Sequence, residues 1–595
     1  MVKRKQSAPK KKQKRPTSIR KLNIFRHQFE ELIRSSERSS LTTSLTLIVI
    51  ANYLTRLNFK ESINRLVRWD PAQWKYSPGV LAQLLVLATF IPANKKTALS
   101  RMNQIFAGMD LELLVGEPVD PADLSDDLFA SMLDRLWEGD CEKILSTIAL
   151  TVRTIFDLPP DYTLHSDTTS HVLYGDYEYS ESSPEGTPRI QPARGHSKDK
   201  RNDLKQIMTG MVADGDGLVR FSHVLDGNTA DCEYNHMMIQ TLQEVYGEEF
   251  KRYTYIADSK LLNKKNLNLI SSDIEPVKLI SKIPENFSGK LAEKIRAKAY
   301  ETPSWHYLGI CCDHPAGKGK EPDYWVQTYQ RKVFDLPVWI HIYKSGDAEH
   351  RLQNKLKKAR EQYESDLKGL TRKVFACEPD AQTDLAAFVK GHSKSFFITN
   401  LSVVSSVTEK NQVGRPARDP KPKQVTVNWS IRAEPLIQNE VRIEIQRQKD
   451  ASFCLLTNVG PDELGSRDVL LKYKGQAKVE HLFSVLKNPL LASTLFLEKT
   501  ERIEAMMTLF YFSVLMHGIL QVISRARIAT CEEPPRLGPE NRPLVRPRSD
   551  TMINILALFE IISEGDAISL RSRMPERAAQ LELILFLVSF DPTAI

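Results

Sequence analysis

The stretch YKGQAKVEHLFSVLK, residues 473–487, decides our interpretation of the fold, and it predicts the second half of a helix from Ser466 to Lys487. At about 100° per residue, four of its polar side chains fall within a stripe of about 60°. They are Tyr473, Gln476, Glu480 and Lys487. Apolar side chains fill the adjacent side, so the helix should bury one face and carry this polar row along the margin. A solvated margin is the plain alternative.

Two acidic residues upstream each follow a segment that is typical of a strand. Asp167 ends Tyr162–Asp167, and Asp258 ends Tyr253–Asp258. In an open sheet, side chains at the ends of strands converge, although they are distant in sequence. Two neighbouring carboxylates repel each other unless a cation lies between them, and their hard oxygens suit Mg²⁺ or Mn²⁺. Turn capping by each aspartate is the alternative.

Together these residues resemble a known family. An acid after a first strand, an acid after a fourth strand and a helix with Tyr-x2-Arg-x3-Glu-x6-Lys are the signature of one branch of the insertion-sequence DDE transposases. This chain has Tyr473-x2-Gln476-x3-Glu480-x6-Lys487, so every spacing is met and glutamine replaces arginine. Other segments resemble further motifs of the family, from about residue 60 to 525: His165–Ser170, Gly195–Gln206, Ile256–Ser259 and Asp123–Leu136.

The resemblance implies an α+β or α/β fold, with an RNase H-like mixed-sheet core that is interrupted by a large β-rich insertion. Such an insertion accounts for the 222 residues between Asp258 and Glu480, which no simple loop needs. The expected parts are a disordered basic tail 1–21, a helical N-terminal domain 22–158, the core 159–262 and 463–530, the insertion 263–462, and a C-terminal helical segment 531–595.

Sequence patterns also predict single elements within these parts. In the core, Leu204–Val212 and Leu218–Leu225 should form a hairpin, and Tyr234–Tyr246 a helix. In the insertion we expect a charged helix from Asp347 to Lys373 and strands at Val425–Ile431, Val441–Gln446 and Phe453–Asn458. The chain from residue 500 to its end should be helical.

By resemblance, the chain is a DNA transposase in which Asp167, Asp258 and Glu480 hold two Mg²⁺ or Mn²⁺ ions. Tyr473 and Lys487 would position a phosphate, and Gln476 would grip it less firmly than arginine does. Its partners would be the double-stranded DNA of the terminal inverted repeats and of the target, bound by a homodimer. An inactive transposase-derived DNA-binding protein and an RNase H-like nuclease without strand transfer are the alternatives.

Positive charge is concentrated in two places, which we expect to contact DNA. Residues 1–21 carry ten Lys and Arg and no acid, whereas the remaining residues sum to −2. The second place is a Pro-rich loop with Arg415, Arg418, Lys421 and Lys423. Both could neutralise phosphates without reading sequence, although the tail could instead be a solubilising extension. We expect a nucleoid-associated cytoplasmic protein in a prokaryote, or a nuclear one in a eukaryote.

Other chemistries find little support in the sequence. Seven irregularly spaced Cys indicate reduced thiols, and Cys311, Cys312 and His314 are too tightly clustered to wrap zinc. A GxxxxGK phosphate loop is missing from the sequence, which argues against ATP use. Ala505–Ile523 is uncharged over 19 residues, but its polar residues favour a buried helix of a soluble protein over a membrane span.

Overall fold

The computed structural model describes residues 38–91, 98–175, 177, 190–195, 201–271, 276–302, 304–312, 322–346, 348–410, 424–487, 497–538, 541–565 and 567–594. The chain divides into two compact units. Unit 1 combines Met1–Lys278 with Lys474–Ile595, and unit 2 is Leu279–Tyr473. Segments before and after unit 2 therefore form unit 1, and the bounds of unit 2 differ from the insertion 263–462 that the sequence predicts.

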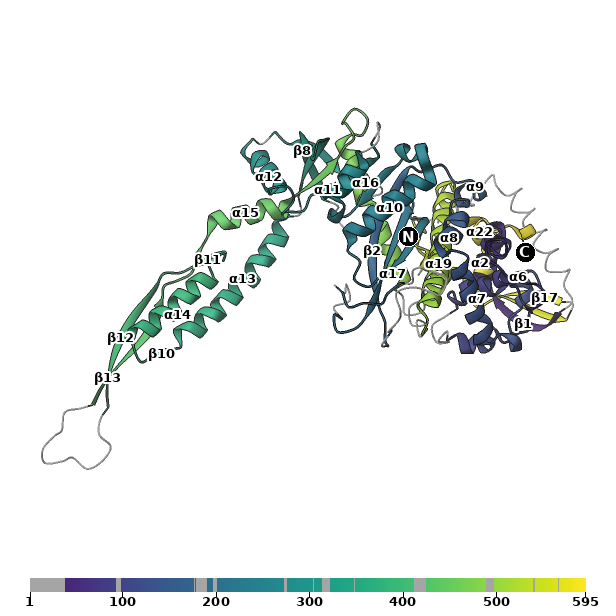
Figure 1. The fold of residues 1–595 in the computed structure, drawn as a ribbon, viewed down its shortest axis with the longest axis horizontal. Helices are drawn as coiled ribbons and strands as arrows, with labels where there is room; N and C mark the ends of the chain where they lie inside the picture. Colours follow the sequence, from purple (N-terminus) through teal and green to yellow (C-terminus); the bar gives the residue numbers. More distant parts are fainter. Residues whose placement is uncertain are drawn as a thin grey trace, which may run out of the picture. The chain divides into compact units, whose positions relative to one another are not determined.

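Unit 1 is built on a mixed sheet with the strand order β4-β3-β2-β5, of which Figure 1 labels β2. The strands are β2 (Thr163–Val172), β3 (Gln206–Asp214), β4 (Val219–Leu225) and β5 (Thr254–Ala257). The first three pair antiparallel, and β5 runs parallel to β2. The predicted hairpin is confirmed, and its turn uses Gly217 at φ +89°, which a residue without Cβ adopts at little cost.

Helices cover this sheet on both sides. On one face of β2, α17 (Gln476–Leu486) lies against the strand, and α10 (Asp231–Tyr246) packs on the other. The long helix α19 (Thr500–Ala529) packs against β4. Length and composition would allow α19 to cross a membrane, but 83% of its apolar window is buried inside the protein. The prediction of a buried helix over Ala505–Ile523 is confirmed.

The N-terminal part of unit 1 is mainly helical, as predicted. Its longer helices share one hydrophobic core with α19: α2 (Leu45–Arg56), α3 (Phe59–Leu66), α4 (Pro78–Ala88), α7 (Asp126–Glu138) and α8 (Cys141–Ala149). Ser44, Ser77 and Ser125 cap α2, α4 and α7 with their hydroxyls, which marks where these helices begin.

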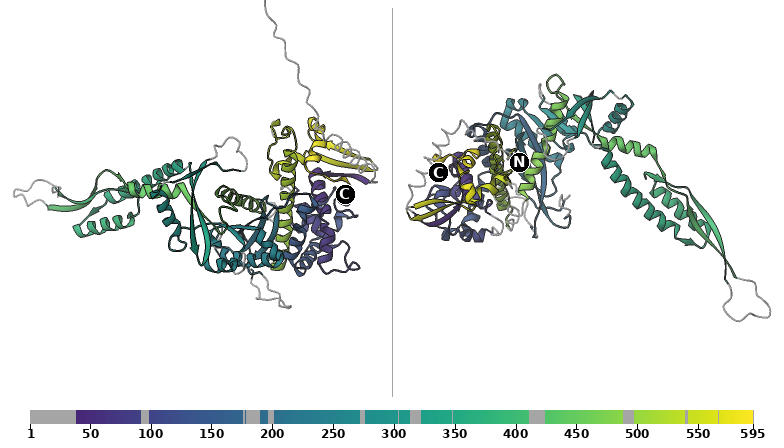
Figure 2. Two further views of the ribbon diagram at one scale, coloured as in Figure 1. Left: turned by 90° about the horizontal axis from the view of Figure 1, so that it is seen from above. Right: turned by 180° about the vertical axis from the view of Figure 1, so that it is seen from behind.

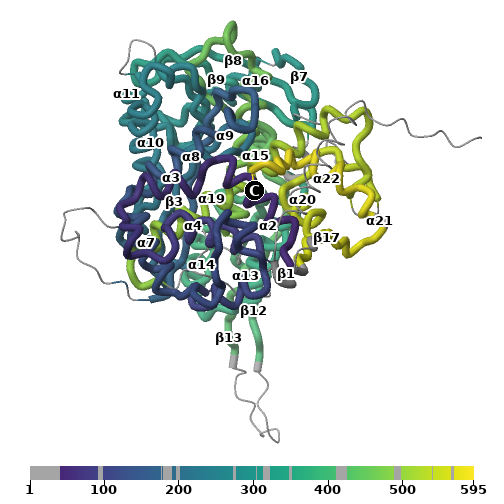
Figure 3. Tube along the Cα trace, turned by 90° about the vertical axis from the view of Figure 1, so that its right-hand side faces the viewer, coloured from purple at the N-terminus to yellow at the C-terminus, as the bar shows by residue number. Residues whose placement is uncertain are grey.

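The prediction of an all-helical C-terminal end is wrong. After α19 and α20 (Ser549–Leu556), the chain forms β16 (Phe559–Gly565) and β17 (Ala567–Ser572), followed by α21 (Pro575–Ala578) and α22 (Leu581–Leu587). In β16, burial alternates, because Phe559, Ile561 and Ser563 are buried and the residues between them are partly exposed. This hairpin pairs with β1 (Arg38–Ser44), so the two ends of the chain share a small sheet (Figure 3).

Unit 2 contains an antiparallel sheet with the order β6-β15-β9-β8-β7. Its strands are β6 (Lys278–Lys282), β7 (His306–Ile310), β8 (Asp323–Val333), β9 (Leu336–Ser345) and β15 (Ser452–Thr457). Helix α12 (Leu291–Glu301) packs on β9 and β15, and α16 (Ser466–Lys474) ends the unit. The predicted strand Phe453–Asn458 is thus confirmed as β15.

Another part of unit 2 is a helix pair packed on a long two-stranded hairpin, which the short strand β10 (Val374–Phe375) extends to a three-stranded sheet (Figure 2). The helices are α13 (Ala348–Thr371) and α14 (Glu378–Gly391), and the hairpin is β12 (Leu401–Lys410) with β13 (Gln424–Ala433). The predicted strand Val441–Gln446 is wrong, because it lies in helix α15 (Glu440–Ala451). Alternating apolar residues suggested a strand there, but only Ile443 is buried, whereas Val441 and Ile445 are exposed. The insertion is therefore mixed rather than simply β-rich.

Candidate active site

The register of β2 and β5 places two acids side by side. Four consecutive pairs, from Thr163 opposite Thr254 to Ser166 opposite Ala257, keep the same offset. Extending that register by one residue brings Asp167 opposite Asp258. Neighbouring strands lie about 4.8 Å apart, and residues that face each other in a parallel pair point to the same side of the sheet. The two aspartates therefore share one face, and both are partly exposed.

The surroundings of the two aspartates differ from the predicted pair of strand ends. Asp258 does follow the last residue of β5, but β2 continues beyond Asp167 to Val172. It continues because its other edge stays paired with β3, where Asp167 faces Met211. Asp167 thus lies at the point where β2 loses its parallel neighbour, and it is partly exposed, whereas the residues on either side of it in β2 are buried.

One carboxylate oxygen of each aspartate accepts a backbone hydrogen bond. Asp167 Oδ1 accepts from Thr168 N at 2.8 Å, and Asp258 Oδ1 accepts from Lys260 N at 2.9 Å. The second bond caps a short 3-10 turn at Ser259–Leu261. Turn capping, which was the alternative to metal binding in the sequence analysis, therefore does occur at Asp258. These bonds to backbone N–H groups restrict how far each carboxylate can turn.

Helix α17 is attached to the face of β2 that carries Asp167. Gln476 Nε2 donates to Ser166 O at 2.8 Å, and Gln476 Oε1 lies 3.1 Å from His165 Nδ1. His165 and Asp167 are two residues apart in a strand, so they point to the same side. One turn after Gln476, Glu480 is exposed on the same helix. The acid of α17 therefore belongs to an element that packs beside the two aspartates.

These contacts differ from the predicted role of Gln476. Its side chain is only 8% exposed, and both ends of its amide are used inside the protein, so it does not face a phosphate. The neighbouring Lys478 makes a second attachment, because its Nζ donates to Gly215 O in the turn after β3. Gln476 and Lys478 position α17, and sequence reasoning missed this function for both.

The predicted helix over 466–487 is interrupted at Gly475, where α16 ends and α17 follows. Tyr473 is the last residue of unit 2, so only Gln476 and Glu480 of the polar stripe lie on α17. Lys487 caps its C-terminus and is partly exposed. The predicted core face of the helix is confirmed, because its four apolar members are buried: Val479, Leu482, Phe483 and Leu486.

A buried group of side chains supports the opposite face of β2. Tyr234 of α10 lies 3.4 Å from Ser166 Oγ through its hydroxyl, and its ring packs against Gly210 of β3. Thr168 Oγ1 donates to Asp231 Oδ1 at 2.6 Å. Gly210 pairs with Thr168, next to Asp167. A glycine within an otherwise buried strand is a signal for such close packing, and it could have been read from the sequence.

The donor chemistry on the open face fits a hard divalent cation, because its three candidate ligands are carboxylates. In the described parts of the chain, however, no three or more His, Cys, Asp or Glu side chains are grouped closely enough to hold a metal ion. Asp167 and Asp258 would be the fixed ligands, and Glu480 would have to turn toward them. The DNA-binding candidates Arg415, Arg418, Lys421 and Lys423, and the tail 1–21, lie outside the described residues.

Comparisons with known proteins give a family match to one part of the chain and distant structural likenesses. Residues 42–150, which include helices α2 to α8, match the family model of a domain of unknown function, DUF4277. No curated protein matches the chain. Among solved structures, a cryo-EM structure of a piggyBac transposase synaptic complex with hairpin DNA matches over 88% of this chain and 82% of that chain. The identity is 10% and the TM-score 0.31, so this likeness does not establish a shared fold.

Proposed function

We propose that the chain is a DDE-type DNA transposase that cleaves DNA strands and transfers them at the ends of a mobile element. The observation that carries this proposal is the register of β2 and β5, which aligns Asp167 with Asp258 on the face against which α17 packs. Glu480 lies on α17, which is attached to that face through Gln476, and it comes from a segment more than 200 residues downstream. An arrangement of three acids from three elements is what the signature of the family implies.

Each residue has a distinct role in this proposal. Asp167, Asp258 and Glu480 would hold two Mg²⁺ or Mn²⁺ ions, which, when bound, would supply Lewis-acid activation of the attacking and leaving oxygens. Gln476 positions α17 through its bonds to β2. Lys487 and Tyr473 would orient the phosphate by charge and hydrogen bonding. The tail 1–21 and the loop 414–423 would hold double-stranded DNA, which a homodimer would bring together at two ends.

The proposal is tested by strand cleavage on a plasmid that carries the DNA flanking this gene, with Mg²⁺ or Mn²⁺ present. Asp167→Asn, Asp258→Asn and Glu480→Gln should each reduce cleavage by about a thousandfold or more, because each removes one ionised oxygen ligand. Binding of the same DNA in EDTA should stay within about twofold of wild type. Glu244→Gln is the matched control, since Glu244 is an exposed acid on α10. Full activity of Glu480→Gln would contradict the assignment.

An inactive DNA-binding derivative is the second candidate, and one observation favours it. The three acids do not form a closed group in the described residues, and Gln476 gives no cation to the site. This candidate predicts DNA binding with no cleavage in either metal. A nuclease, by contrast, would cleave but give no product in which a 3′ end is joined to target DNA.

A further inference from the structure

Unit 2 has a polar groove at the edge of strand β8, and none of the three acids lines it. Its volume is about 450 Å³, and the described residues that line it include no Asp or Glu. Several of its polar side chains can donate hydrogen bonds: Lys298, Ser304, His306, Thr328 and Ser466. A site with an ammonium group, an imidazole and several hydroxyls, and without carboxylates, suits an anion that has many oxygens.

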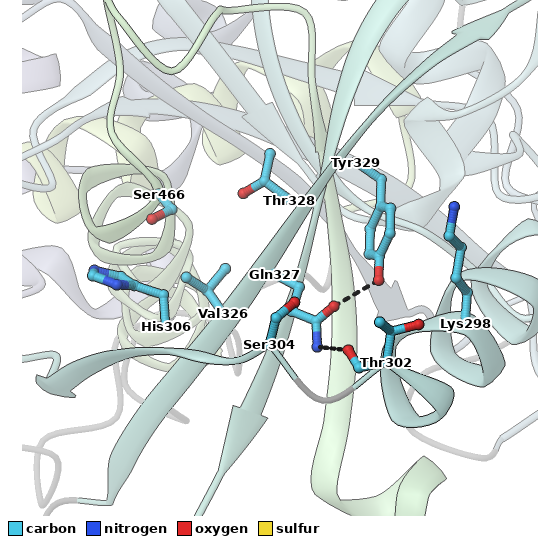
Figure 4. A pocket seen from close by; sticks show the side chains of 9 residues that line it. All are labelled: Lys298, Thr302, Ser304, His306, Val326, Gln327, Thr328, Tyr329 and Ser466. Atoms are coloured by element: carbon cyan, nitrogen blue, oxygen red, sulfur yellow. Dashed lines mark hydrogen bonds between the residues drawn. The ribbon is translucent and has the colours of Figure 1, made fainter.

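The groove exists because β7 covers only the first part of β8. The pairing of these strands runs from Ile310 opposite Asp323 to His306 opposite Val326, whereas β8 continues to Val333. Figure 4 shows donors on both sides of β8: Lys298 lies beside Tyr329 on one side, and Thr328 lies with His306 and Ser466 on the other. An occupant that contacts both sides must cross the strand, so a chain with several phosphates fits better than one phosphate ion.

Buried His341 prepares Thr328 to donate into this groove. The His341 ring is fully buried, and burial lowers its pKa to about 4, so the imidazole is neutral at physiological pH. Its Nδ1 lies 2.8 Å from Thr328 Oγ1, and its Nε2 has no partner among the described residues. An orphaned N–H is less tolerated than an orphaned acceptor, so the proton belongs on Nδ1, which donates to Thr328. The Thr328 hydroxyl hydrogen is then left for a ligand.

Lys298 supplies the positive charge on the other side of the strand. It lies in the last turn of α12 and is exposed, with its Nζ 5.4 Å from the centre of the Tyr329 ring. Arg331 approaches the same ring at 5.7 Å. Tyr329 donates its hydroxyl to Gln327 Oε1 at 2.6 Å, which restrains the ring that both cations approach. The side of β8 that faces α12 is therefore positively charged and pre-arranged.

We propose that this groove binds the sugar-phosphate backbone of DNA, with Lys298 pairing with one phosphate and Thr328 donating to the next. This inference rests on the proposed function only in naming DNA as the carrier of the phosphates. The groove would contact the backbone without reading bases, because it presents donors for phosphate oxygens and no paired donor and acceptor for a base edge.

The test is equilibrium binding of a labelled DNA duplex to the full chain in EDTA, measured by fluorescence anisotropy over a range of KCl concentrations. Lys298→Ala should weaken binding about five- to tenfold and reduce the slope of log K against log salt by about one. Lys294→Ala is the matched control, because it removes an exposed lysine of the same helix outside the groove, and it should change affinity less than about twofold.

Two variants of Thr328 distinguish the loss of a hydrogen bond to DNA from a loss of folding. Thr328→Val keeps the shape but removes the hydroxyl, and it should weaken binding about threefold without changing the salt slope, whereas Thr328→Ser should restore binding. Equal affinities of Lys298→Ala and Lys294→Ala, with Thr328→Val at the wild-type value, would overturn the proposal.

Inorganic phosphate distinguishes the two sources of the phosphate group. At matched ionic strength, phosphate should displace DNA from wild type no more than it does from Lys298→Ala. Selective displacement from wild type would show a site for free phosphate and would contradict a backbone site. These binding measurements are made in EDTA, without divalent metal. A finding that the protein does not cleave DNA would therefore contradict the proposed function but not the binding of DNA in this groove.

Discussion

The two candidate DNA-contacting regions have opposite chemistry. The open face of β2, β5 and α17 in unit 1 presents carboxylates, whereas the groove at β8 in unit 2 presents an ammonium group and hydroxyls and no described carboxylate. A carboxylate face repels a phosphate until cations bind, and the groove attracts one directly. From this difference we expect that the affinity for DNA depends on salt concentration, whereas DNA cleavage depends on divalent metal.

The largest expected effect is that a variant of the acids affects only DNA cleavage, whereas a variant of the groove affects only DNA binding. Asp167→Asn should lower cleavage about a thousandfold and leave binding in EDTA within about twofold, because it removes a metal ligand and no phosphate contact. Lys298→Ala should weaken binding but leave the cleavage rate at saturating protein within about threefold. Single-turnover cleavage and anisotropy on the same DNA measure both. Loss of cleavage at saturation in Lys298→Ala would mean that the regions do not act separately.

A smaller effect is expected where α17 is attached to β2. Gln476→Ala removes the two side-chain contacts that attach α17 to Ser166 and His165 of β2, which should cost about 1–3 kcal/mol of stability. Urea unfolding measures it, with exposed Ser484→Ala on the same helix as the control. Gln476→Arg should also destabilise, because a larger charged group would be buried there. Tighter binding of cleaved DNA ends by that variant would instead support the phosphate role.

Behind β2, the packing of Gly210 against Tyr234 should be sensitive to one methyl group. A Cβ at Gly210 would lie 2.0 Å from Tyr234 Cε2, so Gly210→Ala should destabilise by about 1–3 kcal/mol. Gly369→Ala in α13 meets no atom within 4 Å and should stabilise by about 0.5–1 kcal/mol. Thermal unfolding of the two variants compares a packed glycine with an open one. Equal shifts in Tm would show that the ring of Tyr234 moves away easily.

The last effect concerns the pH dependence of stability and leaves both regions intact. Burial raises the pKa of the Glu504 carboxyl to about 8, although the indole of Trp137 donates to it at 3.0 Å. Between the unfolded pKa of about 4.3 and 8, the folded state holds a proton that the unfolded state has lost. Stability should therefore fall as pH rises through this window, by about 1.4 kcal/mol per pH unit. Glu504→Gln should flatten the profile, and Glu501→Gln should not.

Local patterns predicted the elements that position the acids. The hairpin β3–β4, helix α10 and strand β5 follow from turn residues and apolar spacing. The same patterns failed in α15, where three apolar residues alternate although the segment is helical. The local signal that favours a helix over a strand here is Asn439, whose side chain caps the helix by accepting a hydrogen bond from Arg442 N.

The contacts of Gln476 could not be predicted from periodicity. The helical spacing placed it correctly one turn before Glu480, but spacing does not say which neighbour meets a side chain. The Gly475 interruption and the pairing of Gln476 with His165 depend on how α17 lies on β2, which is a tertiary property. Likewise, the sequence predicted that Asp167 and Asp258 converge at the ends of two strands, but the register of β2 and β5, which runs to the residues just before them, could not be read from it.

The central claim is that Asp167, Asp258 and Glu480 bind divalent metal together. Electron paramagnetic resonance of free Mn²⁺ in a titration with the full chain counts bound ions directly. We expect wild type and Glu244→Gln to bind Mn²⁺ at this site, Asp258→Asn to lose at least tenfold in affinity, and Asp167→Asn with Glu480→Gln to lose the site altogether. Unchanged Mn²⁺ binding in the combined Asp167→Asn, Asp258→Asn and Glu480→Gln variant would contradict the account.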